Sequence, residues 1–145
     1  MASTNADVVR RHFEAFRDGG VDAVAAYCDP EIEWRAVEGA VDDVGVMRGH
    51  EALRRYYADW LATIDDLQAE VEEVLYDSGD TVAAQLRHWG RVPGSSAPIE
   101  GRYAVVCTIR AGRIVSGREY ETPAQALAAL EELRKRTQGE ARHVD

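Results

Sequence analysis

The first half of the chain places apolar residues at the spacing of amphipathic helices. Val8, Val9 and Phe13 share one face of a segment that a pair of glycines ends at residue 20. A broader apolar stripe follows, formed by Leu53, Tyr56, Tyr57, Trp60, Leu61 and Ile64. A short apolar segment that Pro30 closes lies between them. The pattern therefore predicts three helices before residue 65.

The second half of the chain changes to the alternation of β-strands. The predicted strands cover residues 67–77, 81–92, 99–110 and 113–121, and a shorter one covers 31–37. Turn residues separate them at 78–80 and 111–112. Thr122 and Pro123 then fit the N-cap and first turn of a last helix.

This order of elements predicts an α+β protein, because the helices are segregated from a meander of antiparallel strands. We expect a strongly curved, mainly antiparallel sheet with helices packed in its concave face. Residues 1–137 form a single domain in this interpretation, and 138–145 form a loose polar tail. Such an interior is a natural place for a small-molecule ligand.

Composition narrows the class of protein further. The chain has 145 residues, 46% of them hydrophobic, which suffices for one core, and no apolar run approaches the roughly 20 residues of a membrane span. The N-terminus lacks an apolar leader, so we expect a cytoplasmic protein that does not bind membranes. The net charge of −9 argues against a nucleic-acid partner, because phosphate contacts need a basic patch.

Metal and cofactor chemistry has little support in the sequence. Cys28 and Cys107 lie far apart and match no metal-ligand spacing. The four histidines show no paired or clustered motif. We therefore expect no metal and no cofactor.

Three segments, residues 13–35, 47–61 and 112–127, together resemble the SnoaL-like family of the nuclear-transport-factor-two-like superfamily. This superfamily includes polyketide cyclases, ketosteroid isomerases, dehydratases and limonene epoxide hydrolases. The resemblance implies a cone-shaped α+β barrel with a deep pocket, and a homodimer formed through the outer sheet face. It does not settle the activity, because one fold hosts many functions.

The catalytic sets of two relatives are incomplete in this chain. By resemblance, the three catalytic positions of the ketosteroid isomerases fall at His12, near Arg35 and near Val105. Arginine cannot act as the base, and valine donates no hydrogen bond. The epoxide hydrolases use an Asp-Arg-Asp set; Arg87 matches its arginine, but Trp89 stands where an aspartate is needed.

The family register also implies which strand residues face the pocket. It turns Gln85, Arg87 and Trp89 inward on one strand, Val105 and Cys107 on the next, and Gly117, Glu119 and Glu121 on the last. A slip of one residue would reverse each assignment. If the register holds, Glu119 is interior and needs a partner, for which Arg87 is the candidate. This pair is equally compatible with a structural and a functional role.

His12 lies on the apolar stripe of the first helix, where a lone histidine is more often a satisfied core residue than a catalyst. If the protein is an enzyme, His12 is the first candidate for acid–base chemistry, because histidine titrates near neutral pH and the resemblance places this position at the pocket floor. Tyr57 matches a tyrosine that contacts this position in the isomerases, so we expect a His12–Tyr57 contact. The aromatic residues Trp34, Tyr56, Trp60 and Trp89 either pack in the core or form a wall for an apolar ligand.

Two classes of function remain open. In the first, the protein is an enzyme acting on a small, largely apolar metabolite, with His12 as acid–base group and Arg87 and Glu119 as polarising groups. Isomerase, cyclase, dehydratase or epoxide-hydrolase chemistry would fit. In the second, it binds a small molecule without converting it. A dimeric interaction domain that uses the outer sheet face is a weaker alternative.

Overall fold

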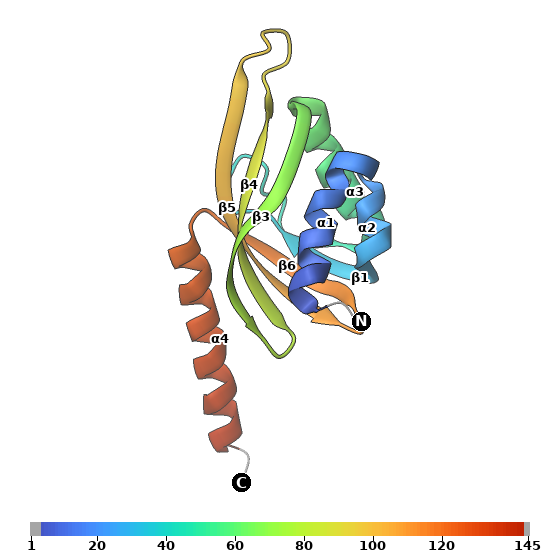
Figure 1. The fold of residues 1–145 in the computed structure, drawn as a ribbon. Helices are drawn as coiled ribbons and strands as arrows, with labels where there is room; N and C mark the ends of the chain where they lie inside the picture. The colour runs from blue at the N-terminus through green and yellow to red at the C-terminus, as the bar shows by residue number, and fades with distance from the viewer. Residues whose placement is uncertain (1–3, 144–145) are drawn as a thin grey trace.

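The computed structural model describes residues 4–143, without the side chains of residues 16–19 and 140–143. Three helices precede a meander of long strands, and a long helix ends the chain (Figure 1). The elements are α1 (Asn5–Gly19), α2 (Asp22–Tyr27), β1 (Cys28–Arg35), β2 (Met47–Arg48), α3 (Gly49–Thr63), β3 (Asp65–Ser78), β4 (Thr81–Arg91), β5 (Pro98–Arg110), β6 (Arg113–Tyr120) and α4 (Pro123–His143). The predicted order is confirmed, and the two-residue strand β2 is added to it.

The strands form one six-stranded sheet in the order β2-β1-β6-β5-β4-β3. Every neighbouring pair is antiparallel except β1 and β6, which run parallel. The sheet is curved but does not close into a barrel, since β2 and β3 are its two edges (Figure 1). The α+β class is therefore confirmed, with an open curved sheet in place of a closed cone.

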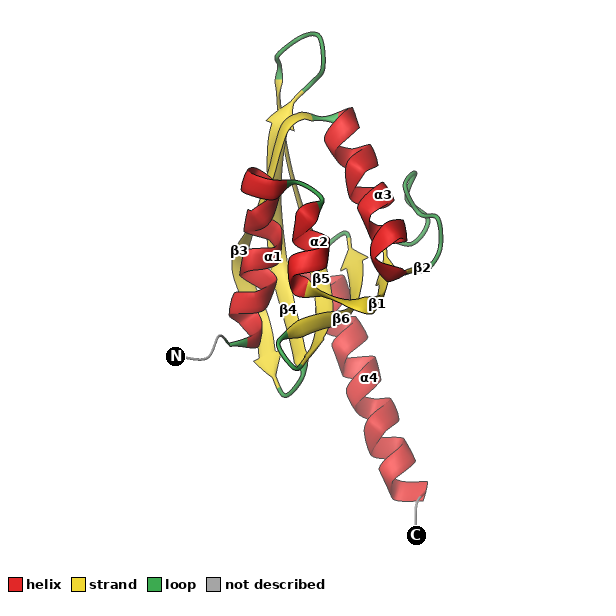
Figure 2. Cartoon of the chain, turned by 90° about the vertical axis from the view of Figure 1, so that its right-hand side faces the viewer, coloured by secondary structure: helices red, strands yellow, loops and turns green. Residues whose placement is uncertain are grey.

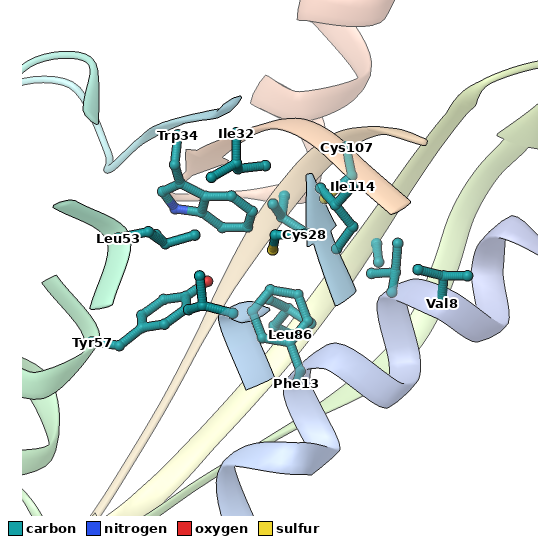
Figure 3. Packing of buried hydrophobic residues seen from close by; sticks show 14 of the residues in the cluster. Val8, Phe13, Cys28, Ile32, Trp34, Leu53, Tyr57, Leu86, Cys107 and Ile114 are labelled. Atoms are coloured by element: carbon teal, nitrogen blue, oxygen red, sulfur yellow. The ribbon is translucent and has the colours of Figure 1, made fainter. Parts of the chain in front are cut away.

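Helices α1, α2 and α3 lie on one side of the sheet, while α4 packs against the other (Figure 2). Apolar side chains from α1, α3, β1, β4 and β6 fill the space between the first three helices and the sheet (Figure 3). The largest fully buried side chain is Trp34, and Phe13, Ile32 and Leu53 are also fully buried. This core holds the helix layer against the strands that carry the candidate site.

Both terminal helices begin with side-chain caps. Thr4 and Asp7 form a capping box at α1. At α4, Thr122 and Gln125 form the same pair of reciprocal hydrogen bonds between side chain and backbone N–H, which confirms Thr122 as the predicted N-cap. The last helix continues to His143, so the expected loose tail from residue 138 is helical up to that point. Residues 144 and 145 lie outside the described part of the chain.

The outer face of the sheet divides into an apolar part and a charged part. Where α4 packs on this face, Ala83 of β4 and Ala126 of the helix are both fully buried. Farther along β4, Arg87 lies between carboxylates of the neighbouring strands. The homodimer through this face stays a prediction. None of the described helices combines the length and apolar character that crossing a membrane requires.

Candidate active site

A cavity with a volume of about 280 Å³ opens between α3, the concave face of the sheet and the loop of residues 36–46. Its lining residues are Val37, Ala40, Asp42, Tyr56, Tyr57, Trp60, Leu67, Ala69, His88, Arg102, Tyr103, Glu119 and Glu121. Aromatic and aliphatic surface dominates, with a few polar groups among it. This combination is typical of a site for a small organic molecule.

Glu119 is the buried carboxyl of this cavity. Strand alternation turns it inward from β6, and its side chain is 9% exposed. The Trp34 indole N–H donates to Glu119 Oε2 over 2.7 Å, and the Tyr56 hydroxyl lies 2.9 Å from the same oxygen. Burial raises the pKa of Glu119 to about 7, although these two hydrogen bonds oppose the shift. A carboxyl with this pKa can accept and return protons at neutral pH.

Asp42 brings a second carboxyl to the same hydroxyl. Tyr56 Oη lies 3.0 Å from Asp42 Oδ2, and the Trp60 indole N–H donates to that oxygen over 3.1 Å. The structure turns Asp42 into the cavity.

The neighbouring Asp43 shapes the loop itself. The backbone N–H groups of Gly39 and Gly45 donate to its carboxylate over 2.9 and 3.0 Å. These hydrogen bonds, with that from Arg35, lower the pKa of Asp43 to about 2. Asp43 therefore fixes the loop from within, while Asp42 faces the cavity.

The expected His12–Tyr57 contact is confirmed. His12 Nε2 lies 2.9 Å from Tyr57 Oη, and the imidazole is fully buried. The other ring nitrogen, His12 Nδ1, lies 3.8 Å from Cys28 Sγ. Burial lowers the pKa of His12 to about 4. His12 lies behind Tyr57 and outside the cavity lining, where it orients the tyrosine.

The predicted inward face of β4 is wrong. Gln85 donates to Glu72, and Arg87 pairs with Glu70 and Glu100, all on the outer face. The Arg87 guanidinium also lies 4.4 Å from the centre of the Trp89 ring on that face. Arg87 is therefore not the partner of Glu119, which uses Trp34 and Tyr56 instead.

On β4, His88 faces the cavity in place of the predicted Arg87 and Trp89. A Cβ atom on Gly101 would lie 2.5 Å from His88 Nε2, so glycine there makes room for the ring. Tyr103 lies beside it, with ring centroids 5.4 Å apart. Within the described part of the chain neither group has a hydrogen-bond partner, and both line the cavity. The alternation of Val82, Ala84 and Leu86 is the sequence signal that points to His88.

The remaining predicted residues divide between the cavity and the core. Tyr56, Tyr57, Trp60 and Glu121 line the cavity, as does Glu119. Trp34, Val105 and Cys107 are buried in the core. The space beside Gly117 is filled, because a Cβ atom there would lie 2.1 Å from Trp34 Cζ3. Gly117 thus accommodates the indole that reaches Glu119. Among the described residues, no group of three His, Cys, Asp or Glu side chains is arranged to hold a metal ion.

The buried groups His12 and Glu119 give the protein opposite dependences of stability on pH. His12 has a folded pKa near 4 against 6.5, so it contributes stability above pH 6.5 that is lost as pH falls toward 4. Glu119 has a folded pKa near 7 against 4.5, so its contribution is complete below pH 4.5 and is lost as pH rises toward 7. In the interval that both share, from pH 4.5 to 6.5, the rise in stability from His12 and the fall from Glu119 cancel.

We therefore expect the Glu119→Gln variant to reveal the histidine slope. Its free energy of unfolding should rise by about 3 kcal/mol between pH 4 and 6.5, relative to the wild type. Urea unfolding at several pH values measures this. A His12→Gln variant is the counterpart, and its stability should fall with rising pH over the same interval. Parallel curves for the wild type and both variants would contradict the assignment of these pKa shifts.

Comparison with known proteins places this geometry in a family. The sequence profile of the SnoaL-like domain matches residues 9–117. The chain belongs to the SnoaL-like domain family. A relative from Streptomyces peucetius, aklanonic acid methyl ester cyclase DnrD, is 34% identical over 119 residues, covering 80% of this chain and 79% of the relative.

Solved structures share the fold of this SnoaL-like protein. IdmH from Streptomyces antibioticus, provisionally assigned as a polyketide cyclase, has a TM-score of 0.70 at 21% identity, covering 89% of this chain and 99% of IdmH. TerC, crystallised with polyporic acid, has a TM-score of 0.69 at 18% identity, covering 90% of this chain and 98% of TerC. A protein of Catenulispora acidiphila with a ketosteroid isomerase-like fold, in complex with trimethylamine, has a TM-score of 0.68 at 20% identity. The match covers 87% of this chain and 92% of that protein. At these identities the likeness concerns the fold alone.

Proposed function

We propose that this SnoaL-like protein is a cofactor-independent cyclase in which Glu119 transfers the proton. The observation that carries the proposal is a buried carboxyl, with a pKa raised to about 7, at the wall of a largely apolar cavity. A carboxylate of this kind can remove a proton from a carbon next to a carbonyl group. The relationship to aklanonic acid methyl ester cyclase supports ring closure as the reaction type.

The proposed reaction conserves all atoms of the substrate. Ionised Glu119 takes the proton of an activated C–H bond, and the electron pair of that bond becomes an enolate. The enolate carbon attacks a second carbonyl carbon of the same molecule and closes the ring. The resulting alkoxide takes the proton back from Glu119, so the carboxylate is regenerated.

Two neutral side chains are suited to holding the oxygen that becomes negative. Burial lowers the pKa of His88 and raises that of Tyr103, so both are neutral hydrogen-bond donors at pH 7. Neither is engaged by another described side chain through a hydrogen bond, and both line the cavity. We propose that they bind the carbonyl oxygen of the substrate and stabilise the enolate.

The aromatic walls define the substrate class. Tyr56, Tyr57 and Trp60 line one side of the cavity, and Tyr103 lines another. Such walls favour flat, largely apolar rings. We therefore propose an aromatic polyketide-like molecule carrying a carbonyl group and an acidic C–H bond.

Deuterium exchange tests the proposal without requiring knowledge of the product. The protein is incubated in D₂O with aklanonic acid methyl ester and simpler aromatic β-ketoesters, and NMR follows loss of the activated proton. We expect catalysed exchange, with a rate that rises as pH passes about 7 because the carboxylate is the active form. Tight binding of these compounds without exchange or cyclisation would instead favour a non-catalytic binding protein.

A further inference from the structure

The Tyr56 hydroxyl has more acceptors around it than it has protons. Its oxygen lies 2.9 Å from Glu119 Oε2 and 3.0 Å from Asp42 Oδ2. A phenol carries one proton and can donate to only one of them. The other contact is a hydrogen bond only if that carboxyl carries a proton and donates it to Tyr56 Oη.

The outer ends of this chain of contacts are fixed. Trp34 donates to the Glu119 oxygen and Trp60 donates to the Asp42 oxygen, and an indole N–H can only donate. Neither indole can supply the missing proton. With one proton shared between the two carboxyls, all four contacts become hydrogen bonds; with none, two ionised carboxylates face one hydroxyl.

We propose that Glu119, Tyr56 and Asp42 form one proton relay, in which Asp42 is a second acid–base group that connects the buried Glu119 to solvent. Glu119 gives its proton to Tyr56 Oη while Tyr56 gives its own to Asp42 Oδ2. Both O–H bonds are replaced by new ones, and the total charge of the three groups does not change. The reverse transfer returns the proton to Glu119.

Within the relay, Asp42 is the charged group that acts on Glu119. Tyr57 on α3 and Tyr103 and Cys107 on β5 also face Glu119, and burial raises the pKa of all three, so they stay neutral. His88 and Glu121 complete the ionisable cavity lining, together with Arg102, whose guanidinium pairs with Glu72 and Glu100. After burial, the charge of Asp42 is what raises the pKa of Glu119.

The loop of residues 36–46 supplies the connection to solvent. Asp43 pins it internally, which keeps the half-buried Asp42 at the cavity wall where it can exchange protons with water. The relay rests on the proposed function for its catalytic meaning, since a resting Glu119 that is protonated must lose its proton before it can start a turnover as the base. Its existence as a shared-proton unit does not depend on turnover.

Carboxyl ¹³C NMR titration tests the relay in the whole protein. Glu119 and Asp42 are assigned by comparison with Glu119→Gln and Asp42→Asn. In the wild type we expect the Asp42 signal to change in the same step in which Glu119 titrates. Asp42→Asn should lower the midpoint for Glu119 by about one pH unit, because a negative charge is removed. Tyr56→Phe should abolish the shared step in the Asp42 signal.

A matched charge removal separates the relay from a general electrostatic effect. Asp59 is exposed on α3, near Tyr56 in sequence, so Asp59→Asn removes the same charge without touching the relay. Independent titration of Asp42 and Glu119 in the wild type would overturn the relay. The relay would also be overturned if Glu119 had the same midpoint in Asp42→Asn as in Asp59→Asn. A coupled titration without deuterium exchange on any substrate would uphold the relay and count against the cyclase.

Discussion

Replacing Glu119 by glutamine lowers the rate of substrate deuterium exchange by roughly 10²- to 10⁴-fold, which is the usual contribution of a positioned acid–base group. Glutamine keeps the length of the side chain and an oxygen that can accept from the Trp34 indole. It cannot accept the substrate proton at neutral pH. We expect substrate affinity to change far less than the rate, because the aromatic walls remain. The measurement is exchange rate against substrate concentration.

Two further variants make this result specific. Glu119→Asp retains a titratable carboxyl one methylene farther from the substrate, so it should recover part of the rate. Glu132→Gln changes an exposed glutamate on α4 that is not part of the cavity lining. This variant should catalyse substrate exchange at the wild-type rate. Circular dichroism establishes that each variant is folded. If Glu119→Gln exchanged as fast as the wild type, Glu119 would not be the base and the proposed mechanism would be wrong.

The helices and most strands could be predicted because their apolar spacing is regular, but the family register misplaced β4 by one residue. Val82, Ala83 and Ala84 are all fully or almost fully buried. The outer face of the strand is covered here by α4, while the inner face joins the core. Burial on both faces hides the alternation at the start of the strand, and only the polar Gln85 and Arg87 on either side of Leu86 distinguish its two faces. Arg87 was consequently paired with Glu119, whereas its partners lie on adjacent strands.

The candidate site was predictable in part on its regular elements, where His88 and Tyr103 were missed. The family resemblance implied that Glu119 faces inward, helix periodicity grouped Tyr56, Tyr57 and Trp60 on one face, and all four line the cavity. Asp42 belongs to a loop with no repeating pattern. Its orientation depends on Asp43, whose backbone partners at Gly39 and Gly45 become neighbours only after the loop folds. Local sequence does not distinguish these two adjacent aspartates.

Replacing Gly117 by alanine should lower the free energy of unfolding by about 3 kcal/mol, at the upper end of the range for overpacked cores. The added Cβ would lie 2.1, 2.3 and 2.8 Å from three carbon atoms of the Trp34 ring. That ring is rigid and 1% exposed, so it cannot turn away without disturbing the core. Urea unfolding measures the loss, and the thermal midpoint should fall by roughly 10 °C.

The same substitution should also change the site, which distinguishes it from a merely destabilised core. Displacing Trp34 weakens the hydrogen bond from its indole N–H to Glu119, and this hydrogen bond lowers the pKa of the carboxyl. The NMR midpoint of Glu119 should therefore rise above that of the wild type. Gly139→Ala is the control, because a Cβ there meets no atom within 4 Å and alanine favours the helix. It should be unchanged or slightly more stable. Equal stability of the two variants would mean that Trp34 does not occupy the space beside Gly117.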